Sequence, residues 1–209
     1  MSGIHYYVID TETTGLKSNY HEMTEIGIIR CSDRVQLWRQ IKCFYPERAS
    51  LDALEITKKS LHDLENGMDP TKVVEECDKF FNEDGVSPSH RCIVAHNATF
   101  DRKFLHAFWQ KQEKIFPANL WLDTISLTRE YAKKVGILKP KVNLQAACDI
   151  VGIKKLSGAH NAKVDARNTF LLHKNLIEEK QINYLPFIKT AAHIDSSQDE
   201  RLDPDLLDI

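Results

Sequence analysis

Residues 4–16 read IHYYVIDTETTGL, an apolar run that gives way abruptly to acidic and hydroxyl side chains. The run 4–9 is rich in β-forming residues and apolar on both faces, which predicts a central strand covered on two sides. Asp10 and Glu12 lie two residues apart, so an extended chain projects both carboxylates to the same side. Because neighbouring carboxylates repel and lose hydration, we expect a divalent cation to compensate them. The alternative is a pair of strand-end acids facing water, which the complete DTETTG string disfavours.

The composition of the 209-residue chain is that of an ordinary globular protein, with 42% hydrophobic and 28% charged residues. We predict a single domain over residues 1–185 and an acidic, flexible tail over residues 186–209. We expect no membrane partner, because the sequence has no apolar run of membrane-spanning length and no signal-peptide pattern. Five cysteines without C-x-x-C spacing favour reduced thiols and a cytoplasmic location.

The formal net charge of −2 is unevenly distributed along the chain. Residues 195–209 contain six acidic residues and one basic residue, which leaves 27 basic and 24 acidic residues in residues 1–194. The body of the chain therefore carries a charge of about +3. Divalent cations bound to some of its acids would make it more positive, so a polyanionic partner remains compatible with the overall charge.

Strands come first along the sequence and then alternate with helices, which predicts an α/β fold with a mixed sheet. Alternation and β-forming composition predict the strands, and apolar residues at helical spacing with Asp, Asn and Gly caps predict the helices. The predicted strands are 4–9, 25–30, 36–44, 92–95 and 119–122, and the predicted helices are 57–65, 70–81, 97–111, 123–134, 143–151 and 161–179.

Asp101 interrupts the apolar face of the predicted helix 97–111. Its neighbours at i+4 and i+7 are Leu105 and Phe108, so the carboxylate points toward the sheet. A buried carboxylate needs a cation or hydrogen bonds. The alternative is an acid in the first helical turn that is favoured by the helix dipole.

Asp165 repeats this anomaly on the predicted helix 161–179, where Thr169 and Leu172 share its face. His160 lies five residues before Asp165 and ahead of the helix. A single histidine is more often structural than catalytic, but a histidine beside an inward-facing acid is a better candidate for proton transfer.

Three motifs occur in order: DTETTG at 10–15, HNATFD at 96–101 and HNAKVDA at 160–166. Together they resemble the DEDD superfamily of 3′–5′ exonucleases, in the branch with a catalytic histidine (DEDDh) that includes the proofreading, epsilon-type or DnaQ-like enzymes. The resemblance implies a ribonuclease-H-like fold, with a five-stranded mixed β-sheet flanked by α-helices. It also implies two Mg²⁺ or Mn²⁺ ions as cofactors and His160 as general base. The implied metal ligands are Asp10, Glu12, Asp101 and Asp165.

The resemblance also implies a pocket for the 3′-terminal nucleotide, with Leu16 wedged against its base. Ile56 belongs to a segment that resembles the stretch closing over this base, although ALEIT at 53–57 departs from the commoner IHGIT. The implied substrate-binding residues are Thr13, Thr14, Gly15, Leu16, Ile56 and Asn97. Candidate basic residues of a nucleic-acid groove are Arg102, Lys103, Lys139, Lys141 and Lys163.

The function that we predict is removal of nucleoside 5′-monophosphates from the 3′ end of single-stranded DNA, as in proofreading or DNA repair. The predicted partner is a nucleic acid with a free 3′ end, and a DNA polymerase or another replication protein is a candidate protein partner. Two alternatives stay open. One is a 3′–5′ exoribonuclease that acts on short RNA or RNA 3′ ends, and the other is a non-catalytic binding module of the same fold.

Overall fold

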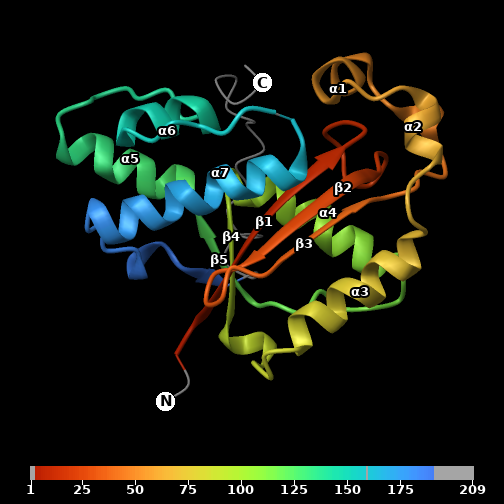
Figure 1. Ribbon diagram of the computed structural model, residues 1–209, viewed down its shortest axis with the longest axis horizontal. Coiled ribbons are helices and arrows are strands. Elements are labelled where there is room, and N and C mark those ends of the chain that lie inside the picture. Colours follow the sequence, from red (N-terminus) through yellow and green to blue (C-terminus); the bar gives the residue numbers. More distant parts are fainter. Residues whose placement is uncertain (1–2, 159, 191–209) are drawn as a thin grey trace.

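The computed structural model describes residues 3–158 and 160–190, which form a mixed sheet covered by helices on both faces (Figure 1). Within these residues the sheet has six strands in the order β3-β2-β1-β4-β5-β6. β1 pairs antiparallel with β2 and parallel with β4, so the acidic motif lies on a central strand. The strands are β1 (His5–Thr13), β2 (Met23–Arg30), β3 (Gln36–Gln40), β4 (Arg91–Ala95), β5 (Leu120–Asp123) and β6 (Lys189–Thr190).

The helices divide between the two faces because side chains of each strand alternate between them. Tyr7 and Ile9 of β1 pack in a core with α3 and α4. Val8 points the other way, into a core with α5, α6 and α7. The α-helices are α1 (Leu51–Thr57), α2 (Leu61–Glu65), α3 (Pro70–Asn82), α4 (Ala98–Gln110), α5 (Thr124–Lys134), α6 (Leu144–Val151) and α7 (Ala162–Lys174). None of the helices in the described residues is long and apolar enough to cross a lipid bilayer.

The α/β class and the mixed sheet are confirmed, and four predicted element boundaries are wrong. The predicted strand 4–9 continues to Thr13. The predicted helix 57–65 is two short helices, because Lys58 adopts a left-handed conformation (φ 54°) and Ser60 caps a new start. The predicted strand 36–44 ends at Gln40. The predicted helix 161–179 leaves regular α-helical geometry after Lys174 and continues as a π-helical turn over residues 175–179.

The sheet has one strand more than the resemblance implied, because β6 pairs antiparallel with β5. Residues 189–190 fall in the region that the sequence assigned to a tail, so the folded part of the chain extends beyond the predicted boundary at residue 185. The acidic residues of the predicted tail lie in 191–209, outside the described residues.

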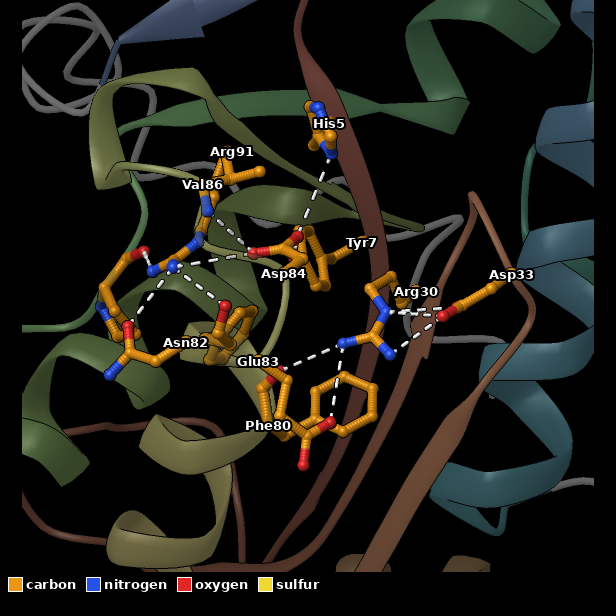
Figure 2. Close-up of polar contacts among 12 residues, drawn as sticks. His5, Tyr7, Arg30, Asp33, Phe80, Asn82, Glu83, Asp84, Val86 and Arg91 are labelled. Atoms are coloured by element: carbon orange, nitrogen blue, oxygen red, sulfur yellow. Dashed lines mark hydrogen bonds and ion pairs between the residues drawn. The ribbon is translucent and has the colours of Figure 1, made fainter.

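A buried polar network fixes the start of β1, at the opposite end of this strand from Asp10 and Glu12 (Figure 2). The hydroxyl of Tyr7 donates a hydrogen bond to Asp84. Arg91, which is 1% exposed, places its guanidinium 3.9 Å from Asp84 and donates to the carbonyl oxygen of Phe81 at 2.8 Å. The network ties the α3–β4 loop to the sheet, so it stabilises the scaffold without contributing to the acidic motif.

Candidate active site

Three carboxylates meet at the end of β1. Asp10 and Glu12 project from β1 toward α7, and Asp165 projects from the first turn of α7. One oxygen from each carboxylate lies within 4.8 Å of the others. We call Asp10, Glu12 and Asp165 the carboxylate cluster. Carboxylate oxygens are the ligands that Mg²⁺ and Mn²⁺ prefer, so this arrangement can hold a divalent cation.

Gly27 allows α7 to approach the sheet at the cluster. Its Cα is paired with that of Asp10 across β1 and β2. A Cβ at position 27 would lie 2.3 Å from the carbonyl oxygen of Ala162, the first residue of α7. A side chain there would push the helix away, so the missing Cβ sets the distance between Asp165 and the β1 acids.

Asp101 approaches the same region from α4, on the other side of the sheet. Its side chain is buried, and Oδ1 accepts hydrogen bonds from the backbone N–H of Thr11 at 3.0 Å and from Thr11 Oγ1 at 2.8 Å. Asp101 is not within the group of three oxygens. Its charge is nevertheless the strongest electrostatic influence that raises the pKa of Asp10. The structure therefore places Asp101 beside the carboxylate cluster, held by Thr11.

The protonation equilibria of these acids are strongly perturbed. Burial, followed by repulsion from Asp101 and Asp165, raises the pKa of Asp10 well above its ordinary value. Burial and repulsion from Asp165 raise the pKa of Glu12 to about 8, and burial raises the pKa of Asp101 to about 7. The repulsion between neighbouring carboxylates decreases when they bind either protons or cations, so these oxygen donors fit divalent metal ions.

His160 lies two residues before the start of α7, in a left-handed conformation with φ 62°. Its backbone N–H donates to Asp165 Oδ2 at 2.8 Å, which ties the histidine to the carboxylate cluster. Burial lowers the pKa of its half-buried imidazole below the ordinary histidine value. Lys155 also reaches this carboxylate, with Nζ 3.7 Å from Asp165 Oδ1. Lys155 belongs to none of the three motifs, so no sequence signal pointed to it.

The DTETTG turn is held by its own hydroxyl groups. Thr13 Oγ1 donates to the carbonyl oxygen of Gly15 at 2.7 Å. Thr14 is 1% exposed, and its Oγ1 accepts the backbone N–H of Glu22 at 2.9 Å. A Cβ on Gly15 would overlap the imidazole of His21. These residues shape the turn, and the turn presents Leu16, which is 45% exposed, to solvent.

The remaining predicted substrate residues lie on two other elements. Ile56 is half-buried on α1, and this helix follows directly after Ser50, whose backbone N–H donates to Thr14 O at 2.8 Å. Asn97 has φ 71° and precedes α4, with its N–H donating to Asp123 Oδ1 at 3.1 Å. The prediction that Arg102 lines a groove is wrong, because its side chain is 5% exposed.

Sequence reasoning also missed Glu25, which lies on β2 directly across from Glu12 and is 2% exposed. The available signal was an acidic residue at the start of the apolar run EIGII. Asp123 was also missed, because its place at the start of a predicted helix accounts for an acidic residue without a further role. Its carboxylate accepts N–H groups from Asn97 and Ala98, and so anchors the start of α4.

Comparison with known proteins agrees with this geometry. Residues 7–172 match the family model Exonuclease (RNase_T). The DNA polymerase III PolC-type protein of Mycoplasmopsis pulmonis is 27% identical over 187 residues, which are 85% of this chain and 12% of that protein. Two similar folds are E. coli Exonuclease I in complex with a dT13 oligonucleotide and a 3′-exonuclease whose structure describes 3′-end-specific recognition of the histone mRNA stem-loop. The Exonuclease I structure has a TM-score of 0.69 at 16% identity, and the match covers 85% of this chain and 42% of the Exonuclease I chain.

The 3′-exonuclease structure has a TM-score of 0.67 at 12% identity, and the match covers 86% of this chain and 84% of the 3′-exonuclease chain. The chain thus spans only a small part of its PolC-type relatives but most of a separate 3′-exonuclease. The family match covers the strand that carries the acidic motif, the helix of Asp101 and the start of α7. The chain therefore belongs to the Exonuclease (RNase_T) family and has the DnaQ-like fold of 3′–5′ exonucleases.

Proposed function

We propose that this protein removes nucleoside 5′-monophosphates one at a time from the 3′ end of single-stranded DNA. The observation that carries this proposal is the carboxylate cluster, with His160 tied to Asp165. The family match supports the reaction class. The DNA-bound structural neighbour and the polymerase relatives support DNA as substrate and a polymerase as candidate partner.

The chain's own residues have separable roles in this proposal. Asp10, Glu12 and Asp165, with Asp101 beside them, would hold divalent cations, for which we propose Mg²⁺ or Mn²⁺. Bound cations would acidify a water molecule and offset the charge that develops on the phosphodiester. His160 is neutral at neutral pH, because burial lowers the pKa of its imidazole, so the ring can accept a proton from the attacking water.

The family match supports the 3′-end polarity, and the resemblance implies a pocket for the terminal nucleotide beside the cluster. Leu16 is exposed at the end of a turn that the hydroxyls of Thr13 and Thr14 hold in place. Together with Ile56 on α1, Leu16 would contact the terminal base, and Asn97 would lie near the phosphate. A base must leave its stack to enter such a pocket, which favours single-stranded ends.

An exoribonuclease is the second candidate, and one observation favours it. The chain matches 84% of a 3′-exonuclease whose structure describes recognition of a histone mRNA stem-loop, whereas it matches 42% of the DNA-bound Exonuclease I. An enzyme that selects RNA must contact the 2′-hydroxyl.

The deciding experiment is digestion with Mg²⁺ or Mn²⁺ of 5′-labelled single-stranded DNA, single-stranded RNA and a duplex with a mismatched 3′ end. We expect a ladder that shortens by one nucleotide at a time, fastest on single-stranded DNA, and slow digestion of the same strand with a 3′-phosphate. Asp165→Ala serves as the inactive control. Cleavage of a circular single strand would overturn the exonuclease assignment, and faster digestion of RNA would favour the second candidate.

A further inference from the structure

Glu25 is a buried carboxylate for which the proposed reaction has no role. It lies on β2 and is 2% exposed, with its Cα paired with that of Glu12 on β1. It is not one of the three residues whose oxygens converge on a candidate cation position. Burying an unpaired carboxylate is strongly unfavourable, so its partners indicate what this position does.

Three groups from three separate segments meet at this side chain. The ammonium of Lys59, between α1 and α2, pairs with Oε1. The indole N–H of Trp38 on β3 donates to Oε2 at 3.1 Å. The backbone N–H of Ala162, the first residue of α7, donates to Oε2 at 3.1 Å. One carboxylate on β2 therefore joins the α1–α2 segment, the edge strand β3 and the start of α7.

The Lys59 contact holds one end of the segment 51–60. The other end is held by Ser50, whose N–H donates to Thr14 O at 2.8 Å in the DTETTG turn. The side chain of Lys59 is only 12% exposed, so the ammonium is committed to Glu25 and is not a free surface charge. One end of the segment that carries Ile56 is thus fixed to the turn that follows β1, and the other end is fixed to β2.

The Ala162 contact holds the other half of the site. Ala162 lies two residues after His160 and three before Asp165. Its N–H is one of the free donors of the first helical turn, and a carboxylate there also interacts favourably with the helix dipole. Gly27 sets how closely α7 approaches the sheet, and Glu25 supplies an attachment point at that closest approach.

We propose that Glu25 is a positioning residue that holds the segment 51–60 and the start of α7 in register with the carboxylate cluster. The Lys59 contact positions the part of the pocket that receives the 3′-terminal nucleotide, and the Ala162 contact positions Asp165 and His160. This role rests on the exonuclease activity proposed above.

Two double variants separate the two contacts without leaving a buried charge unpaired. In Glu25→Gln/Lys59→Met, the amide oxygen can still accept from Ala162 and Trp38, so only the Lys59 contact is lost. In Glu25→Ala/Lys59→Met the contacts with Ala162 and Trp38 are lost as well. The matched control is Asp78→Ala/Lys114→Met, because Asp78 likewise accepts a tryptophan N–H (Trp109, 2.8 Å) and pairs with a lysine (Lys114, 2.9 Å), but between α3 and α4.

We expect Glu25→Gln/Lys59→Met to raise KM for a single-stranded oligonucleotide by about tenfold, with kcat within about twofold of wild type. Glu25→Ala/Lys59→Met should also lower kcat by about 10–100-fold and weaken calorimetric Mn²⁺ binding by a similar factor, which is the usual effect of removing a group that orients metal ligands. The Asp78 control should lower the melting temperature and leave KM, kcat and Mn²⁺ affinity unchanged.

The proposal is overturned if Glu25→Ala/Lys59→Met loses stability but keeps wild-type KM, kcat and Mn²⁺ affinity, since Glu25 would then be only structural. The single variant Glu25→Gln must match the KM of Glu25→Gln/Lys59→Met. A further rise on removal of Lys59 would mean that the lysine acts on substrate directly. If the wild-type protein proves inactive on nucleic acid, the proposed function fails, whereas Mn²⁺ binding and amide hydrogen exchange at residues 162–165 still test the Ala162 contact.

Discussion

Glu12→Gln should stabilise the metal-free protein above neutral pH, at the cost of metal binding. Glu12 contributes charge to the carboxylate cluster, and its pKa is raised from 4.5 to about 8 by burial and by repulsion from Asp165. A carboxyl group whose pKa is higher in the folded state binds protons more tightly there than in the unfolded chain. The folded state therefore gains stability as pH falls through about 8. Above that value Glu12 is ionised in the folded state, and the destabilisation caused by its buried charge no longer changes with pH.

The magnitude follows from the pKa of Glu12. With a folded-state pKa of about 8, protonation of Glu12 alone, on lowering the pH from about 8.5 to about 6.5, should add about 2 kcal/mol to the free energy of unfolding of the metal-free protein, and Asp101, with a pKa of about 7, acts in the same direction. For a domain of this size that corresponds to a rise of about 4–8 °C in melting temperature. Buried His96 and His173, whose pKa values are lowered to about 4, act in the opposite direction. The two histidines lower the free energy of unfolding mainly as pH falls below 6.5, the pKa of histidine in the unfolded chain. Most of this effect therefore lies below the pH window of the assay.

The assay is thermal unfolding of the metal-free protein across this pH window, repeated with saturating Mn²⁺. Glu12→Gln should have a higher melting temperature than wild type at the alkaline end of the window. Its melting temperature should rise less than that of wild type on acidification and on addition of Mn²⁺. The control is Glu55→Gln, which removes an exposed charge on α1 and should follow the wild-type curve. The reasoning is refuted if the metal-free wild type is no more stable near pH 6.5 than near pH 8.5, or if Glu12→Gln retains the full pH response.

Three further changes test other parts of the structure. His160→Ala should lower kcat by about 10²–10⁴-fold and still bind Mn²⁺ by calorimetry, and a loss of Mn²⁺ binding as complete as that of Asp165→Ala would contradict its role as base. Gly27→Ala should lower both Mn²⁺ affinity and melting temperature, because the new methyl group would lie 2.3 Å from Ala162 O. Gly3→Ala, with nothing within 4 Å, should leave both values unchanged. Asp84→Ala should cost about 2–4 kcal/mol in urea unfolding, with unchanged kcat for the folded fraction because the network in Figure 2 lies at the far end of β1. A fall in kcat would show that this network also shapes the site.

Short-range periodicity was sufficient to predict the acids that the structure brings together. Two residues on one strand with a spacing of two must share a face, so Asp10 and Glu12 could be paired from the sequence. Asp101 and Asp165 could be placed because each interrupts an apolar helical face. The structure confirms both faces, since Asp101 and Asp165 are buried against the sheet.

Local signals were insufficient where a hydrogen bond or a backbone reversal decided the outcome. The break at Lys58 between α1 and α2 depends on one left-handed residue and the cap at Ser60. The contact between Thr14 Oγ1 and the backbone N–H of Glu22 joins two residues of a loop, and the motif did not indicate it. Arg102 had the charge of a groove residue, but α4 turns it inward, where it is 5% exposed.

The sequence by itself determined the α/β class, the order of the elements and the four acids with the neighbouring histidine, because these depend on periodicity and on motif spacing within single segments. Only the tertiary structure decided which of these groups touch and what holds them there. The oxygens of Asp10, Glu12 and Asp165 converge because Gly27 lets α7 approach the sheet. Glu25 joins Lys59 and Ala162, which are 34 and 137 residues away along the chain. Contacts at such separations depend on how strands and helices pack, which no local pattern of residues encodes.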